Sequence, residues 1–83
     1  MAHLPVPTVL SVAGIRVTIN LNDHQPPHVH CYVGDGVVLV LLEPSVRERA
    51  RRGRVTARDV RRVLSLVGDN RAELLEAWSA IHG

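Results

Sequence analysis

The spacing of the apolar residues changes once along the chain, and this change limits the folds that it can adopt. From Ile15 to Leu21 apolar residues occupy every second position, which is typical of a strand with one buried face. From Ala57 onwards they recur at intervals of three and four residues, which is typical of an amphipathic helix. Strands that precede helices, rather than alternating with them, predict an α+β fold.

The first predicted hairpin joins two β-rich runs, Thr8–Val12 and Ile15–Leu21. Only Ala13-Gly14 separates them, and this spacing is typical of a two-residue turn. In the resulting register Val12 faces Ile15. The two runs therefore predict a tight antiparallel hairpin.

The second predicted hairpin pairs the strand His28–Val33 with the strand Val37–Glu43. If Asp35-Gly36 forms a two-residue turn, the register pairs His28 with Glu43. We therefore expect a four-stranded antiparallel sheet with a carboxylate beside His28.

Two helices are predicted after the sheet. Ser45–Arg54 is rich in Arg and predicts a loop or a short helical turn. Thr56 stands three residues before Asp59 in the manner of a capping box, so a helix should begin near Ala57. Gly68-Asp69-Asn70 interrupts this helix and offers an N-cap for a second one. The predicted order is ββββαα, with both helices on one face of the sheet and the other face open.

Length and composition favour one small intracellular domain. The 83 residues suffice for a single core over residues 1–83, with residues 1–6 as a disordered tail. The longest apolar run, Val37–Leu42, is far shorter than the roughly 20 residues that span a bilayer, so no membrane association is expected. The single Cys31 excludes an internal disulfide, and Met1–Pro5 lacks the features of a secretion signal. We therefore expect a cytoplasmic protein.

Positive charge is concentrated in the second half of the chain. The net charge is +2, and all ten basic residues are Arg, a side chain suited to phosphate or carboxylate. Seven of them form a candidate surface for nucleic acid or for an acidic partner: Arg47, Arg49, Arg51, Arg52, Arg54, Arg58 and Arg62. The alternative is a solvated helix face with local pairs such as Asp59–Arg62.

The candidate chemistry lies in the segment Asp23–His30, which ends with two histidines. His28 and His30 alternate with apolar residues, so both should project from the polar face of the sheet, about 6–7 Å apart. Pro26-Pro27 stiffens the chain just before them. With His24 from the preceding loop, and with Glu43, they could form a zinc-type ligand set. Three readings remain open: structural histidines, acid–base or phosphate-contacting groups, and metal ligands.

The same residues would also suit RNA cleavage without a metal ion. One histidine would take the proton of the 2′-hydroxyl and the other would protonate the leaving oxygen. Glu43 would orient a histidine, Arg16 would stabilise the phosphate, and Tyr32 would stack on a base. On this reading the chain is a metal-independent, ribonuclease-like enzyme that needs no cofactor, whereas the ligand reading calls for a zinc-type divalent ion.

Five segments resemble one known family. They are Pro7–Leu10, Pro26-Pro27-His28-Val29-His30, Glu43-Pro44, Thr56–Arg62 and Leu74-Leu75-Glu76-Ala77-Trp78. In these the chain resembles the bacterial family catalogued as domain of unknown function 4160, from about Pro7 to the end. The resemblance implies one half of a two-gene module of the toxin–antitoxin type, with a cognate small protein encoded nearby, and it supplies no catalytic residues.

Together these features favour a toxin-like component that acts on RNA or another phosphate-bearing target through His28 and His30. The first alternative is a non-catalytic module that binds an acidic cognate partner through the polar sheet face or the Arg cluster. The second is a small metal-binding domain.

Overall fold

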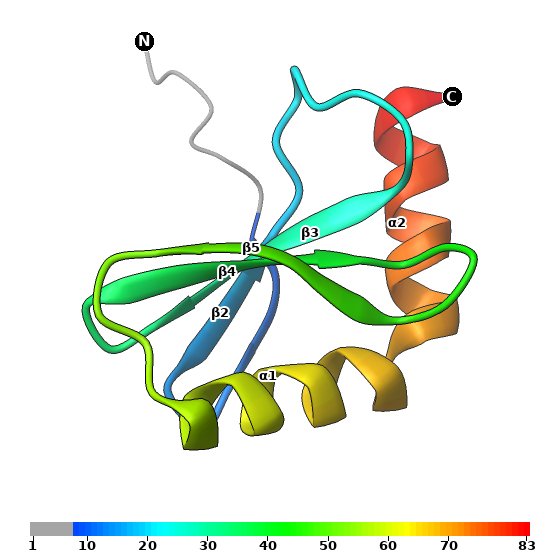
Figure 1. Ribbon diagram of the computed structural model, residues 1–83. Helices are drawn as coiled ribbons and strands as arrows, with labels where there is room; N and C mark the ends of the chain where they lie inside the picture. The colour runs from blue at the N-terminus through cyan, green and yellow to red at the C-terminus, as the bar shows by residue number, and fades with distance from the viewer. Residues whose placement is uncertain (1–7) are drawn as a thin grey trace, which may run out of the picture.

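A computed structural model describes residues 8–83, which fold into one antiparallel sheet followed by two helices (Figure 1). The elements are β1 (Thr8–Val12), β2 (Ile15–Thr18), β3 (His28–Val33), β4 (Gly36–Leu41), β5 (Arg47–Arg52), α1 (Ala57–Asp69) and α2 (Arg71–His82). The strands lie side by side in chain order, from β1 to β5. The α+β class is confirmed, but the prediction of four strands is wrong, because the sheet has five. The predicted disordered tail, residues 1–6, lies outside the described residues.

The additional strand, β5, is the segment that the sequence predicted to be a loop or a helical turn. It pairs antiparallel with β4 at the edge of the sheet, and most of its side chains are exposed. A strand in this place needs only backbone hydrogen bonds to one neighbour, so its sequence shows no apolar alternation. Its charged side chains also protect the outer edge of the sheet from pairing with other chains.

The register of the first hairpin is as predicted, whereas that of the second differs. Val12 pairs with Ile15 across a turn in which Ala13 and Gly14 both have positive φ angles, 51° and 81°. In the second hairpin the turn is Gly34-Asp35, so that His28 pairs with Leu41. The predicted pairing of His28 with Glu43 is therefore wrong.

Two glycines account for the position of the second turn. Gly34 adopts a φ of 55°, which suits a turn position. Gly36 lies inside β4, where a Cβ atom would stand 2.8 Å from the carbonyl oxygen of Arg52. The close approach of β5 therefore requires glycine at position 36 within the strand, and the turn moves one residue towards the N-terminus.

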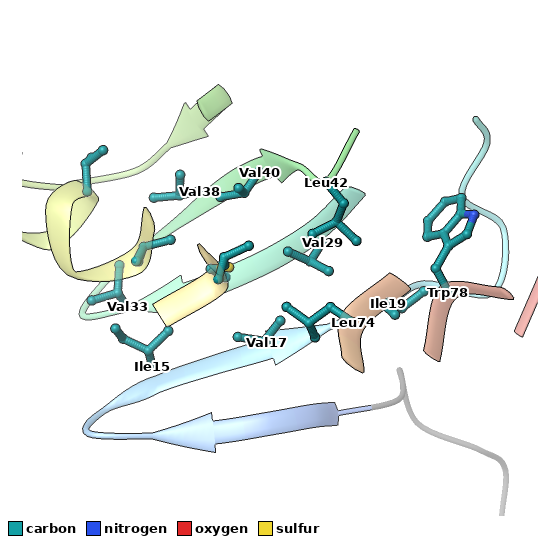
Figure 2. Close-up of a cluster of buried hydrophobic side chains, with 14 residues drawn as sticks. Ile15, Val17, Ile19, Val29, Val33, Val38, Val40, Leu42, Leu74 and Trp78 are labelled. Atoms are coloured by element: carbon teal, nitrogen blue, oxygen red, sulfur yellow. The ribbon is translucent and has the colours of Figure 1, made fainter. Parts of the chain in front are cut away.

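The hydrophobic core lies between the sheet and the helices (Figure 2). Alternate residues of the three central strands and one stripe of α1 fill it, in agreement with the predicted periodicities: Ile15, Val17, Val29, Cys31, Val33, Val38, Val40, Val60, Val63 and Val67. The predicted cap is also present, since the Thr56 hydroxyl accepts a hydrogen bond from the Asp59 backbone N–H at 3.0 Å. Leu74 and Trp78 bring α2 into the same core.

The two faces of the sheet are covered differently. In Figure 1, α1 lies across one face, and the loop between β2 and β3 rises on the opposite side. Helix α2 stands at one end, where the Arg71 side chain donates a hydrogen bond to the Leu42 carbonyl at 2.7 Å. Within residues 8–83, neither helix has the length and apolar character that crossing a membrane requires. We call the face opposite α1 the open face.

Candidate metal centre

Three potential metal ligands converge at the start of β3. Asp23, in the loop between β2 and β3, places its carboxylate between His28 and His30. The Nε2 atom of His28 lies 3.5 Å from Asp23 Oδ1, and that of His30 lies 3.2 Å from Asp23 Oδ2. One ligand atom from each residue falls within 4.8 Å of the others, the only such group among residues 8–83. We call these residues the Asp-His-His cluster.

The loop itself holds the Asp23 carboxylate in place. The Asn20 backbone N–H donates a hydrogen bond to Asp23 Oδ2 at 3.0 Å, and the Asp23 N–H donates to the Asn20 carbonyl at 3.2 Å. Asp23 begins the segment singled out in the sequence but was given no role there, because Glu43 was assigned as the carboxylate. The available signal was local, because an Asn and an Asp three residues apart in a polar loop are typical of a turn closed by a side chain.

The segment before β3 determines which nitrogen of His28 faces the cluster. His28 Nδ1 lies 2.9 Å from the Pro26 carbonyl oxygen, which can only accept a hydrogen bond. The proton of the neutral ring is therefore on Nδ1, and the lone pair is on Nε2, next to Asp23. The Pro27 carbonyl in turn accepts from the Leu42 N–H at 2.9 Å. Both proline carbonyls thus anchor this segment.

The Nε2 atom of His30 lies between a hydrogen-bond donor and the Asp23 carboxylate. It lies 3.2 Å from Asn20 Nδ2, an amide nitrogen that donates hydrogen bonds. The same Nε2 lies 3.3 Å from Asp23 Oδ1, which is an acceptor. The Nε2 atoms of both rings therefore face the Asp23 carboxylate, and either a bound cation or a proton on one of these nitrogens satisfies the three groups. Such donor sets hold zinc and non-haem iron, and a histidine ligand commonly donates its other N–H to a carbonyl, as His28 does.

A cavity of about 380 Å³ opens beside the cluster on the open face. Leu39 and Ala50 form part of its wall, and Arg49 and Arg52 bring two guanidinium groups to it. Arg49 reaches it because of a β-bulge: Leu39 pairs with Ala50 and Val40 with Glu48, which leaves Arg49 as an extra residue in β5. A ligand in this cavity would meet the cluster on one side and positive charge on the other.

The structure separates the other predicted site residues from the cluster. His24 is exposed on the loop and lines the cavity, but it is not one of the three converging ligands. Glu43 is exposed beyond the end of β4. The Arg16 guanidinium lies over the Tyr32 ring, 4.6 Å from its centroid, and is not part of the cavity wall.

The seven Arg residues of the predicted binding surface do not form one surface. Arg51 binds Glu48 through two hydrogen bonds of 2.6 and 2.8 Å, and this contact holds the pKa of the Glu48 carboxyl below its ordinary value. Arg62 pairs with Asp59 at 3.3 Å, as predicted by the alternative in which the Arg residues form a solvated helix face with local ion pairs. Arg58 is exposed on α1 and Arg54 is exposed just after β5. Only Arg49 and Arg52 line the cavity.

Comparison with known proteins identifies a family and no closer relative. A family model described as domain of unknown function (DUF4160) matches residues 14–79, which include the whole Asp-His-His cluster and β5. No curated protein matches the chain. No solved structure matches it either.

Proposed function

Because the chain belongs to the DUF4160 family, whose description names no activity, we propose a function from the Asp-His-His cluster itself. The cluster is a binding site for a zinc-type divalent cation, and the chain uses this cation to act on a phosphate-bearing substrate. One observation carries the proposal: three potential ligand atoms converge within 4.8 Å, and the Pro26 carbonyl orients His28 so that its Nε2 faces the other two. This departs from the metal-free site expected from the sequence.

Each residue around the cluster has a part in the proposed chemistry. Asp23, His28 and His30 would hold the cation, which supplies Lewis acidity for hydrolysis. Three protein ligands leave further coordination positions for water and substrate on the cavity side. Arg49 and Arg52 would bind the anionic oxygens of the substrate and stabilise the charge that builds up during its attack by water.

The biological role that we propose is that of a toxin-like component of a bacterial two-gene module. The chain would act in the cytoplasm on RNA or another phosphate-bearing target, and a small cognate protein encoded nearby would bind it and relieve its effect. The resemblance to the family, together with the pair of Arg residues beside the cluster, supports this role.

Metal binding tests the first part of the proposal. We expect the full chain, purified without an affinity tag, to bind Zn²⁺ at a ratio of one to one in calorimetry and to give visible absorption bands with Co²⁺. Asp23→Asn preserves the shape of the side chain and should weaken binding by more than about 100-fold, because it removes an anionic ligand. The matched control is His24→Gln, on the same loop, which should change the affinity less than about threefold. Substoichiometric binding, or equal losses in both variants, would contradict the site.

Growth measurements test the second part. Expression of the chain alone should slow growth, and Asp23→Asn should abolish this effect at equal levels of soluble protein. Co-expression of the neighbouring gene product should restore growth. A chain that is harmless alone, or an Asp23→Asn variant that remains fully harmful, would exclude the toxin-like role.

A second candidate is acid–base catalysis by the two histidines without a metal ion. It is favoured by the position of Asp23 between the two rings, at 3.5 and 3.2 Å, where a carboxylate would stabilise a protonated imidazole. A chelator separates the two candidates. Hydrolysis of a single-stranded RNA should stop in chelator and return with Zn²⁺ if the cation acts, and it should continue unchanged if the histidines act alone.

A further inference from the structure

We infer that the open face of the sheet is a binding platform for single-stranded nucleic acid, which leads a phosphodiester group to the Asp-His-His cluster. This inference rests on the proposed function, because it names the class of substrate that the proposed site would act on. It depends on three features of the open face: the sign of its charges, a stacked pair of side chains, and their position relative to the cluster.

The charged strand residues on the open face are all positive. Residues paired across an antiparallel sheet project from the same face, so Arg16 shares a face with Tyr32, and Arg52 shares it with Val37. Arg47 joins them opposite Leu41, and the bulge turns Arg49 into the cavity. Within residues 8–83, no acidic strand residue projects from this face, because Glu48 pairs with Val40 on the other side. Such a surface attracts a polyanion.

Arg16 and Tyr32 form a stacking surface on the same face. The guanidinium of Arg16 lies over the Tyr32 ring at 4.6 Å, and Tyr32 is only half buried. Unpaired bases of single strands stack on aromatic rings and on Arg guanidinium planes, whatever the base. A double helix hides these base surfaces, so the pair favours an unpaired strand.

The stacking pair and the cluster lie in line along β3. Tyr32 and His30 are two residues apart on one face, which separates their side chains by about 7 Å. A base stacked on the Arg16–Tyr32 pair would therefore bring the neighbouring phosphodiester to the cavity. There Arg49 and Arg52 would hold its oxygens, next to the proposed cation site. An acidic protein segment could satisfy the Arg residues but has no base to stack.

Oligonucleotide binding to the full chain, measured by fluorescence anisotropy in chelator, tests the inference without the metal ion. Tyr32→Ala should weaken binding of a labelled 12-nucleotide oligouridine about 5- to 100-fold. Arg52→Gln should weaken it as well and reduce the dependence of the affinity on salt by about one ion. The matched control is Arg58→Gln, an exposed Arg on α1, which should change the affinity less than about twofold.

The outcomes separate this inference from the proposed metal centre. Because oligonucleotide binding is measured in chelator, its loss does not follow from a loss of Zn²⁺ binding, and a chain that binds Zn²⁺ but no oligonucleotide would overturn the platform alone. Equal weakening by Arg58→Gln and Arg52→Gln would overturn the platform, since binding would then follow net charge alone. Competition by polyglutamate as strong as that by oligouridine of equal charge would also overturn it, and would indicate an acidic protein partner instead.

Discussion

At the start of β3, residues on both faces of the strand are hidden from solvent, but different interactions hide them. On the helix side Val29 and Cys31 are both 0% exposed and touch apolar neighbours of the core. On the open face His28 is only 7% exposed, yet it is surrounded by a carbonyl, a carboxylate and two aromatic rings. Low exposure therefore has two meanings within one strand: apolar packing on one side, and a polar site covered by a loop and a helix on the other.

Unsatisfied polar groups mark the same difference. Among the described residues, four buried side-chain atoms lack a hydrogen-bond partner: Thr18 Oγ1, Asn20 Oδ1, Trp78 Nε1 and His82 Nε2. Thr18 pairs with His30, and the Asn20 amide contacts the His30 ring. The Trp78 ring is next to the rings of both His28 and His82, with centroids 5.3 and 4.0 Å away. Three of the four therefore belong to residues beside His28 or His30, and a folded protein tolerates such groups at functional sites.

The largest expected loss of stability comes from placing a charge on the core side of β4. The same change on the open face of β4 is the comparison. Val40→Asp puts an unpaired carboxylate among core residues, since Val40 is 0% exposed, and should cost more than about 4 kcal/mol. A domain of this size is stable by roughly 4–12 kcal/mol, so this loss amounts to at least about a third of its stability. Val37→Asp, on the open face opposite Arg52, should cost less than about 1 kcal/mol.

Urea unfolding followed by the fluorescence of Trp78, the single and buried tryptophan, measures both variants. Equal losses of stability in Val40→Asp and Val37→Asp would mean that the open face is packed as the helix side is, and the comparison of the two faces would fail.

Period-two and period-3.6 spacing predicted most of the fold, because each position on a buried face of a strand or helix carries an apolar residue. The spacing assigned Val29 and Cys31 to the core and both histidines to the opposite face, and the burial agrees. β5 could not be predicted in this way, because an edge strand held by backbone hydrogen bonds carries no such mark.

The candidate site was only half predictable, because its parts come from different levels of structure. His28 and His30 follow from alternation within one strand. The carboxylate does not, because its choice depends on register: a shift of the turn by one residue replaces Glu43 with Leu41 opposite His28. Asp23 enters through a loop whose course depends on the Asn20 hydrogen bonds, which a pattern of residue types does not reveal.

Trp78 joins the two faces, and its removal should have the next largest effect. It is 3% exposed, belongs to the core and also touches the His28 ring. Trp78→Ala should destabilise the fold by about 3–5 kcal/mol and should also weaken Zn²⁺ binding, because His28 loses the ring beside it. Trp78→Phe should restore most of both. Thermal unfolding by circular dichroism and calorimetry with Zn²⁺ measure the two effects, and unchanged metal affinity in folded Trp78→Ala would show that Trp78 serves the core alone.

Thiol reactivity compares two neighbouring residues on opposite faces. Burial raises the pKa of the Cys31 thiol to about 12, so at pH 8 only about one thiol in ten thousand is ionised. Cys31 should therefore react with a disulfide reagent only on unfolding. A thiol at position 32, made by Tyr32→Cys in a Cys31→Ala background, should react at least about 100-fold faster in the folded protein. Cys31→Ala alone is the control without a thiol. Equal reaction rates for the thiols at positions 31 and 32 would show that both faces of β3 become accessible to the reagent together.

The smallest effect should come from the ion pair on the helix side of β5. Arg51 holds the pKa of Glu48 below its ordinary value of 4.5, so the ionised form stabilises the folded state above that pH. The stabilisation is lost as the pH falls through the lowered pKa, because the carboxyl is then protonated in both states. Glu48→Gln should therefore lower the thermal midpoint at pH 7 by less than about 4 °C, and the difference from the unaltered chain should vanish at strongly acid pH.

Two further substitutions test whether the stabilising effect of the Glu48–Arg51 ion pair is confined to the helix side of β5. Glu43→Gln, which removes an exposed carboxylate from the end of β4, should leave the thermal midpoint at pH 7 unchanged, because no ion pair within residues 8–83 involves Glu43. Arg52→Gln, on the open face, should leave the thermal midpoint unchanged, because no acidic residue within residues 8–83 forms an ion pair with it. If Arg52→Gln destabilised the fold as much as Glu48→Gln, the open-face Arg residues would serve stability, and their availability for an anionic ligand would lose its support.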